Sequence, residues 1–403
     1  MVTTVTSYAD ARYRASTGMG YDGVVRISGG GQYGTGALLF DGRAVLTAAH
    51  LVAGATASLS VAFQTGSGTQ TYSVSHTVVN PNYLVWSSSN ADLALVWLSQ
   101  APPLGANRYD IYRDSNEMGQ DFTLVGYGQL GTGATGAVTS NTAALRVQAH
   151  NTFDADAATL KSYLGPSMAW LPMLGTQLAA DFDNGTSTQD ALGRLVGLQN
   201  VGLGLNEGLI AHGDSGGPAF LAGKVAGVAS YTSSLSHGDI NPDLDAQHNS
   251  SFGEMAAWQR MSSFQQWIDQ SMRARYPNAP TRPDEVQKQV SEGHSGTSYT
   301  YFLVQISGTR TSTSTSPLIS VDYATRDGTA TAGSDYVATA GRLNLYPGEG
   351  HAVVPVEIVG DTVREANETF YLDVFSPVGG TLGADVVKLT AVRTILDDDL
   401  PLI

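Results

Sequence analysis

The sequence predicts an all-β protein of two domains. Along its first 276 residues, short apolar runs alternate with glycine-rich turns, which favours a barrel or a sandwich. After a proline-rich segment, apolar and polar positions alternate as they do in strands with one buried face. This second region of about 100 residues has the length of an immunoglobulin-like sandwich. A chain of 403 residues is also too long for one ordinary domain.

The first region contains six segments that we expect to be strands, each rich in aliphatic residues and bounded by turn signals. They span residues 23–29, 36–40, 43–50, 91–98, 121–128 and 224–231. Residues 253–276 differ, because apolar residues recur in their second half at a spacing of three to four: Met261, Phe264, Trp267 and Ile268. This spacing predicts an amphipathic helix at the end of the first domain.

The second region contains three segments with clear period-two alternation, residues 300–307, 351–359 and 369–375. Between the two regions, a polar stretch with three prolines predicts a semi-rigid linker. We therefore predict a first domain at 1–276, a linker at 277–285 and a second domain at 286–403.

Composition excludes several classes of function. The formal charge of −15 argues against binding to the phosphates of nucleic acids, which requires clustered Lys and Arg. The absence of cysteine excludes disulfides, thiolate metal sites and cysteine nucleophiles, and it favours a bacterial origin over a secreted eukaryotic one. No apolar run is long enough to span a membrane, and the first residues lack the pattern of a leader peptide. Either the protein is cytoplasmic, or a leader has been removed.

Three segments carry the residues of nucleophilic catalysis. A serine hydroxyl requires a base, usually histidine, and the imidazole requires a carboxylate that orients it. His50 ends the run AVLTAAH, Asp92 lies within the apolar run NADLALVWL, and Ser215 lies in the turn GDSGGP. Glycines on both sides of Ser215 permit a tight turn, in which the N–H groups of Gly213 and Ser215 could converge as an oxyanion hole.

The motifs TAAH, DLAL and GDSGGP, in this order, resemble the signatures of the chymotrypsin/trypsin-like serine peptidases. The resemblance covers roughly residues 20–275. It implies two packed antiparallel β-barrels, a C-terminal helix and a site between the barrels. It also implies that His50 is the general base, Asp92 its orienter and Ser215 the nucleophile.

The same resemblance assigns a pocket for the substrate side chain. It implies that Leu209 forms the base of this pocket, where an aspartate would select Arg or Lys. An apolar base leaves a basic side chain unpaired, so we predict a preference for apolar or aromatic side chains. The pocket set is Leu209, Ser230, Tyr231, Thr232 and Ala256.

Two features depart from the family pattern. The expected partner of Asp214, a freshly cut Ile-Val-Gly-Gly-like terminus, is not visible. The alternatives are a cut end within the first 20 residues, Arg12 or Arg14, or local backbone and polar groups, and we favour local groups without activation cleavage. The second departure is a long segment before Ser215 that contains Asp181, Asp183 and Asn184. These residues could bind a cation, but a solvated Asx turn is favoured.

The second region contains VDYATRDGTATAGSDYV, LYPGEG, GDTVREANETFYLDV and TILDDDL, which resemble the signatures of a Calx-β domain over residues 286–400. Such domains are seven-stranded sandwiches, and many bind calcium at one end. Calcium prefers six to eight oxygen ligands, largely carboxylates. Gly360 stands where calcium-rich relatives have another acid, which implies one or two ions. The predicted ligands are Glu292, Asp335, Asp361, Glu365, Asp397, Asp398 and Asp399, with Glu368 in the same loop.

The leading interpretation is a serine endopeptidase with a calcium-binding accessory domain. It predicts a protein or peptide substrate, a Ca²⁺ cofactor, no nucleic acid, a possible surface or protein partner of the second domain, and a secreted or extracytoplasmic location. Two alternatives stay open. One is an inactive adhesion or binding protein that retains the peptidase fold. The other is an esterase or acyl transferase that uses the same three residues.

Overall fold

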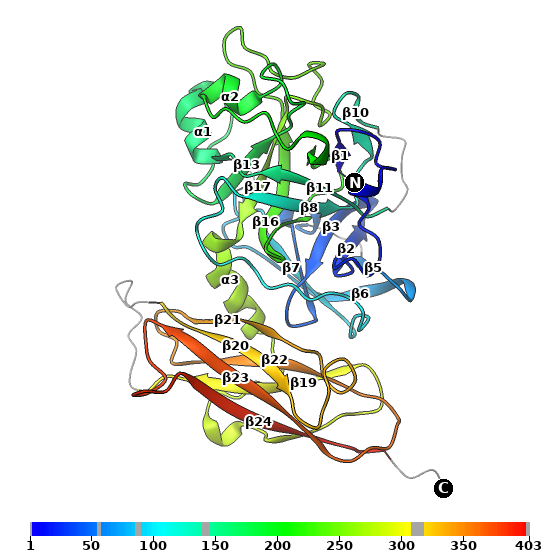
Figure 1. Cartoon of the computed structure of the whole chain (residues 1–403), viewed down its shortest axis with the longest axis vertical. Coiled ribbons are helices and arrows are strands. Elements are labelled where there is room, and N and C mark those ends of the chain that lie inside the picture. Colours follow the sequence, from blue (N-terminus) through cyan, green and yellow to red (C-terminus); the bar gives the residue numbers. More distant parts are fainter. Residues whose placement is uncertain (1, 55–57, 85–89, 139–144, 308–317, 400–403) are drawn as a thin grey trace. The chain divides into compact units, whose positions relative to one another are not determined.

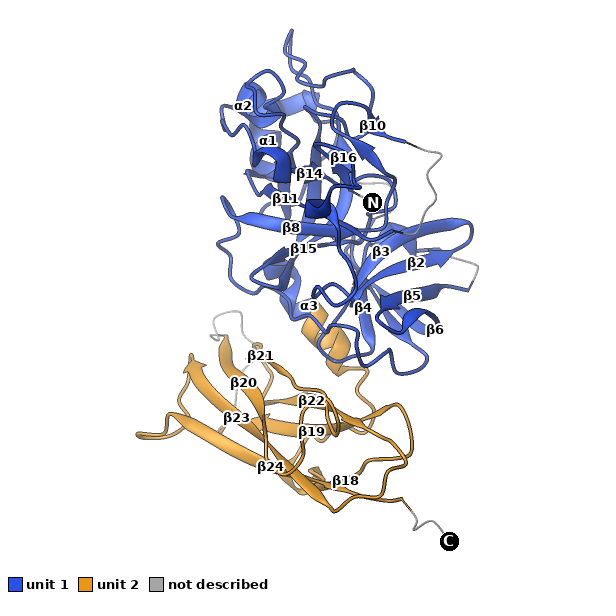
Figure 2. Cartoon of the chain, turned by 45° about the vertical axis from the view of Figure 1, so that its right-hand side comes forward, with its two compact units in different colours: residues 1–267 blue, residues 268–403 orange. Residues whose placement is uncertain are grey.

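The computed structural model describes residues 2–54, 58–84, 90–138, 145–307 and 318–399. The chain divides into two compact units, Met1–Trp267 and Ile268–Ile403, which Figure 2 distinguishes by colour. The division falls inside helix α3 (Met261–Arg273), which follows the strand β17 (Met255–Arg260) directly. The domain boundary at residues 277–285 stays a prediction from the sequence.

The first part of unit 1 is a closed six-stranded antiparallel barrel. Aliphatic side chains from alternate positions of these strands fill its interior, together with Phe63. In barrel order the strands are β2 (Val24–Gly29), β3 (Gln32–Leu38), β4 (Ala44–Thr47), β7 (Ala94–Leu98), β6 (Gly68–Val79) and β5 (Ser60–Thr65).

The second part of unit 1 is a seven-stranded antiparallel half-barrel. Its core contains a cluster of three aromatic rings, in which Phe122 stacks on Phe153 and both meet Trp258 edge-on. In sheet order the strands are β11 (Val147–Thr152), β8 (Asp121–Gly126), β15 (Pro218–Leu221), β16 (Lys224–Ser233), β17, β13 (Gln177–Asp181) and β12 (Ala155–Asp156).

A smaller sheet brings the start of the chain to the strand before Ser215. Its four strands are β10 (Gly136–Ala137), β9 (Gly131–Thr132), β1 (Thr3–Thr4) and β14 (Gly208–Leu209). Thr3 pairs with Leu209, and the preceding residue, Val2, is completely buried.

Two short helices, α1 (Ala157–Leu164) and α2 (Ala191–Val196), lie beside β13 (Figure 1). Each begins at an aspartate that caps it: Asp156 accepts from the N–H groups of Ala158 and Thr159, and Asp190 accepts from that of Gly193. The described residues also form five 3₁₀ turns, η1 (Ala11–Tyr13), η2 (Ala49–Leu51), η3 (Gly165–Ser167), η4 (Gly204–Asn206) and η5 (Pro283–Glu285).

Unit 2 is a sandwich of a five-stranded and a two-stranded sheet around one apolar core. Phe302 of the small sheet meets Phe370 of the large sheet edge-on within this core. The large sheet has the order β18 (Gln289–Ser291), β24 (Lys388–Leu396), β23 (Glu368–Val378), β20 (Ile319–Asp327) and β21 (Ala340–Leu345), and the small sheet pairs β19 (Thr297–Gln305) with β22 (His351–Val359).

The structure confirms the predicted fold class, an all-β protein with two barrels, a C-terminal helix and a sandwich. It differs in that the second barrel is a half-barrel, since only strands β2 to β7 form a closed barrel in the described part of the chain. Among the described residues, no helix combines the length and the apolar character needed to cross a membrane.

Candidate active site

His50 and Asp92 are joined by two hydrogen bonds at the edge of the first barrel. His50 lies in η2, immediately after β4, and its backbone N–H donates to Oδ1 of Asp92 at 2.9 Å. The ring nitrogen Nδ1 lies 2.7 Å from the other carboxylate oxygen, Oδ2. Because a carboxylate only accepts, Nδ1 carries the proton, and Nε2 is left with a lone pair. Asp92 is completely buried, whereas the His50 side chain is 35% exposed.

A third donor reaches the same carboxylate from the second barrel. The hydroxyl of Ser230 donates to Oδ2 of Asp92 at 2.6 Å. Ser230 lies at a β-bulge of β16, where Ala229 pairs with Trp258 and Tyr231 pairs with Ala257. A bulge redirects the side chain of the extra residue. The irregularity therefore turns the Ser230 hydroxyl toward Asp92 and links the two barrels at the site.

The turn that contains Ser215 is held in place by backbone hydrogen bonds on both sides. The N–H of Gly216 donates to the carbonyl of Ala229 at 2.8 Å, next to the bulge. The carbonyl of Ser215 accepts from the N–H of Thr35 in the first barrel at 2.9 Å. Ser215 is therefore fixed between strands of both barrels.

Glycine is required beside Ser215 for two reasons. Gly216 has a φ of +81°, and a Cβ placed on it would lie 2.1 Å from Oγ1 of Thr47 and 2.8 Å from the backbone nitrogen of Ala48. Thr47 and Ala48 are the residues that lead into His50. The Ser215 turn thus packs directly against the segment that carries the predicted base.

The backbone N–H groups of Gly213 and Ser215, which are predicted to form the oxyanion hole, lie on either side of Asp214. Within the described parts of the chain, the backbone N–H groups of Gly213 and Ser215 donate to no protein acceptor. Gly213 has a φ of +95°, and its carbonyl accepts from the hydroxyl of Thr35 at 2.9 Å. This conformation leaves both N–H groups available to a substrate oxygen.

Asp214 is 1% exposed, and two backbone N–H groups donate to its carboxylate. Its Oδ1 accepts from the N–H of Gly128 at 2.8 Å, and its Oδ2 accepts from that of Ala211 at 2.8 Å. Burial raises the pKa of Asp214, while the positive charge of the chain's amino terminus and the Ala211 bond lower it. The two arginines proposed as partners bind other groups: Arg12 pairs with Asp10, and the Arg14 guanidinium donates to the carbonyl of Ala9.

The predicted pocket residues fall into two groups. Leu209 and Ala256 are completely buried and belong to the core of the half-barrel. The other three residues form hydrogen bonds with protein side chains. The hydroxyl of Ser230 donates to Asp92, and that of Tyr231 donates to Gln177 at 2.7 Å. Oγ1 of Thr232 lies 2.8 Å from Nε2 of His248. Ser230 thus has a second candidate role that its place in the motif did not indicate.

The acids predicted as calcium ligands gather at one end of the sandwich. Glu292, Asp397 and Asp399 each offer a carboxylate oxygen within 4.8 Å of the other two. Burial raises the pKa of Glu292 to about 7, and the charges of Asp361 and Asp397 add to this rise. Within the part of the chain that the structure describes, the buried Oε1 of Glu292 and Oδ2 of Asp399 have no hydrogen-bond partner. Such oxygens fit a bound cation.

A second group of acids consists of Asp335, Glu365 and Glu368. Each offers a carboxylate oxygen that lies within 4.8 Å of the other two. Burial raises the pKa of Glu368, as does the charge of Asp335. The backbone N–H of Glu365 donates to Oδ2 of Asp397 at 3.0 Å, which connects this group to the first one.

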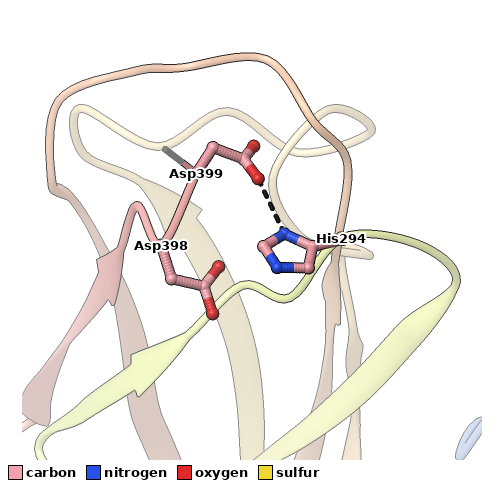
Figure 3. Close-up of side chains that lie close together, drawn as sticks. All are labelled: His294, Asp398 and Asp399. Carbon is pink, nitrogen blue, oxygen red and sulfur yellow. Dashed lines mark hydrogen bonds and ion pairs between the residues drawn. The ribbon is translucent and has the colours of Figure 1, made fainter. Parts of the chain in front are cut away.

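Asp398 joins a third group through a residue that the motif match did not include. Figure 3 shows His294 beside Asp398 and Asp399, with Nδ1 of His294 2.7 Å from Oδ1 of Asp399. Oδ1 of Asp398 accepts from the N–H of Gly293 at 3.1 Å. The only sequence signal for His294 was its position two residues after the predicted ligand Glu292.

Two family models match this chain, one in each unit. Residues 12–168 match the family model Trypsin, and residues 287–399 match the model Calx-beta domain. Among solved structures, neuropsin, a serine protease expressed in the limbic system of mouse brain, aligns with 64% of this chain and 98% of its own, at 17% identity and a TM-score of 0.46.

The curated relatives match only part of this chain. The sodium/calcium exchanger Calx of Drosophila melanogaster is 42% identical over 80 residues, which are 20% of this chain and 8% of the exchanger. Sodium/calcium exchanger 2 of Homo sapiens is 39% identical over 92 residues, which are 20% of this chain and 10% of the exchanger. This chain therefore spans a tenth or less of these two relatives.

Proposed function

We propose that this chain, which carries a trypsin-like domain followed by a Calx-beta domain, is a serine endopeptidase that uses Ser215, His50 and Asp92. The observation that carries the proposal is the set of three donors on Asp92. The Nδ1 proton and backbone N–H of His50 and the hydroxyl of Ser230 hold this buried carboxylate. This arrangement selects the tautomer of His50 in which Nε2 can accept a proton.

The chemistry follows from these groups. Oγ of Ser215 attacks the carbonyl carbon of the peptide while Nε2 of His50 takes the hydroxyl proton. The N–H groups of Gly213 and Ser215 donate to the oxyanion of the tetrahedral intermediate. The intermediate collapses, the peptide C–N bond breaks, and His50 returns the proton to the leaving amine. Water then hydrolyses the acyl-enzyme by the same steps, which regenerates the Ser215 hydroxyl.

The substrate class is a protein or peptide with an apolar or aromatic side chain before the cleaved bond. The apolar character of Leu209 and Ala256 supports this preference, since a buried basic side chain would find no carboxylate on either residue. Cleavage of a peptide library by the purified chain measures the preference directly. Selection of Arg or Lys at this position would refute it.

Calcium binding by the sandwich is the second part of the proposal. Glu292, Asp397 and Asp399 would hold one ion, and Asp335, Glu365 and Glu368 would hold a second. Asp361 and Asp398 would support these two groups. A bound divalent ion neutralises the mutual repulsion of these carboxylates and so stabilises this end of the sandwich. An extracytoplasmic location and a partner for this domain stay predictions.

Labelling with a fluorophosphonate tests the peptidase proposal, because this reagent modifies only an activated serine. We expect the wild-type chain to be labelled and Ser215→Ala not to be labelled. Ser236→Ala is the matched control, since Ser236 is an exposed serine of the same unit. An unlabelled wild-type chain would support the alternative of an inactive binding protein. Labelling together with hydrolysis of esters but not of peptides would support the esterase alternative.

A further inference from the structure

The long segment before Ser215 contains a buried group of acids that the proposed catalysis does not use. Asp181 ends β13, Asp183 follows two residues later, and Asp190 caps α2. Their side chains offer one carboxylate oxygen each, and these three oxygens lie within 4.8 Å of one another. The three residues are 1%, 2% and 2% exposed. The expectation of a solvated turn is therefore wrong for Asp181 and Asp183, although Asn184 does form an Asx turn with Thr186.

Two of these carboxylates each have a buried oxygen that accepts no hydrogen bond from the residues that the structure describes. Oδ2 of Asp181 accepts from the N–H of Leu192 at 2.7 Å, whereas its buried Oδ1 has no N–H donor among the described residues. The carboxyl group of Asp154 is a neighbour of this side chain. Oδ1 of Asp183 is likewise buried, and none of the described residues donates to it. An unsatisfied buried carboxylate oxygen costs free energy, so such atoms call for an explanation. Two such oxygens within one buried acidic group fit a bound cation.

Further acids surround the three residues and add negative charge. Asp154 is a fourth, half-buried acid: its Oδ1 accepts from Asn200 at 2.8 Å, and hydrogen bonds with the backbone and the carboxyl group of Asp181 partly oppose the rise in its pKa that burial causes. Both oxygens of Glu207 are occupied, by the N–H groups of Asp183 at 2.7 Å and of Leu203 at 2.6 Å. Burial raises the pKa of Asp183. The negative charges of four neighbouring carboxylates raise it further, and these belong to Asp181, Glu207, Asp190 and Asp154.

The backbone at Gly202 passes very close to the side chains of Glu207 and Asp183. Gly202 has a φ of +84°, and a Cβ on it would lie 1.7 Å from Oε2 of Glu207 and 2.7 Å from Cβ of Asp183. Only glycine therefore lets the chain pass so close to these side chains. A solvated acidic loop would need no such close approach.

We propose that Asp181, Asp183 and Asp190, with Asp154 beside them, form a calcium site in the peptidase unit. Ligands on opposite sides of Ca²⁺ are about 4.6–5.2 Å apart, because each Ca–O distance is 2.3–2.6 Å. Three oxygens within 4.8 Å of one another fit around one such ion. The donors are all hard oxygens without nitrogen or sulfur, which disfavours Zn²⁺. Three carboxylates in one buried group also disfavour Mg²⁺, which keeps most of its water.

The site would connect the long segment to the active-site strand. A single ion would tie together the end of β13, the start of α2 and, through the hydrogen bonds of Glu207, the strand β14. Leu209 of β14 is the predicted base of the substrate pocket. The calcium proposal nevertheless stands independently of the peptidase proposal, since its evidence lies outside the catalytic residues.

Calorimetric titration of the full chain with Ca²⁺ tests the proposal. The acids of the sandwich must first be substituted, so that calcium binding by unit 2 does not contribute to the signal. The background variant Glu365→Gln/Asp397→Asn/Asp399→Asn removes carboxylates from each acidic group of unit 2. In this background we expect one remaining Ca²⁺ site. Adding Asp183→Asn should weaken that site by about tenfold or more, because it loses a charged ligand. Asp239→Asn, an exposed acid of the same unit, should leave it unchanged.

Melting temperature provides a second readout that also reports folding. Without metal, Asp183→Asn should melt at or above the temperature of its background, because it removes a buried carboxyl group from an acidic group. With Ca²⁺, the order should reverse. No Ca²⁺ binding in the background variant would overturn the proposal, as would equal binding after Asp183→Asn. Binding of Mg²⁺ but not Ca²⁺ would overturn the assignment of the metal.

Discussion

Ser230 and Asp92 come from different barrels and share a hydrogen bond of 2.6 Å. The oxygen that accepts it, Oδ2, also lies 2.7 Å from Nδ1 of His50. Two donors on one carboxylate oxygen restrict its position more than either donor alone. The orientation of the predicted base thus depends on a serine in the second barrel, and this dependence can be tested.

Ser230→Ala should lower kcat by about 10- to 100-fold, because a hydrogen bond to a charged group contributes about 1.5–3 kcal/mol. KM should change little if the hydroxyl acts through Asp92. Steady-state kinetics on a peptide substrate separates the two constants. If KM rises while kcat is unchanged, Ser230 contributes to the substrate pocket and not to the orientation of His50.

Gly216→Ala should lower the free energy of unfolding more than Gly223→Ala does. Both glycines have a left-handed φ, +81° and +74°, which costs about 1–2 kcal/mol for alanine. Only Gly216 has atoms in the way, with Thr47 Oγ1 at 2.1 Å from the added Cβ, whereas Gly223 has none within 4 Å. Urea unfolding of both variants measures the difference. Equal losses would mean that the turn can move away from the His50 segment.

Stability should fall in acid partly because of His150. Burial lowers the pKa of His150 below its ordinary value of 6.5, while the charge of Asp121 partly opposes this. Below pH 6.5 the unfolded chain therefore binds a proton more readily than the folded chain, and stability falls as pH decreases toward the lowered folded-state pKa.

His150→Gln should reduce this acid slope in urea unfolding. Thr123→Val is the control, since it removes the hydroxyl 3.2 Å from Nδ1 of His150 but keeps the titrating ring. The slope should persist in the control. If both variants keep the wild-type slope, other groups produce it.

Calcium should raise the melting temperature of unit 2 through the acids at the end of the sandwich. With the site in unit 1 weakened by Asp183→Asn, the remaining rise should shrink after Asp399→Asn, since Asp399 belongs to two acidic groups. Asp385→Asn should keep the rise, because Asp385 is exposed and its left-handed φ of +60° suits asparagine. A rise that survives Asp399→Asn would place the calcium elsewhere.

Local patterns were sufficient to predict the fold class, because strand alternation and the spacing of Met261, Phe264 and Ile268 are properties of short segments. The helix appears as α3, and strands β2, β8 and β22 lie within two residues of the predicted ranges. The short helices α1 and α2 were not predicted. Each has a capping aspartate, but eight and six residues give too little periodicity to recognise a helix.

In the candidate site, too, some features were predictable from local sequence and others were not. The motifs around His50, Asp92 and Ser215 are local, so the sequence was enough to name them. Two features depended on how distant segments fold together. The bulge in β16 turns Ser230 from a predicted pocket wall toward Asp92, and a register shift of one residue leaves no mark in the sequence. Burial of Asp181 and Asp183 depends on β13, α2 and Gly202, which converge only in the folded chain.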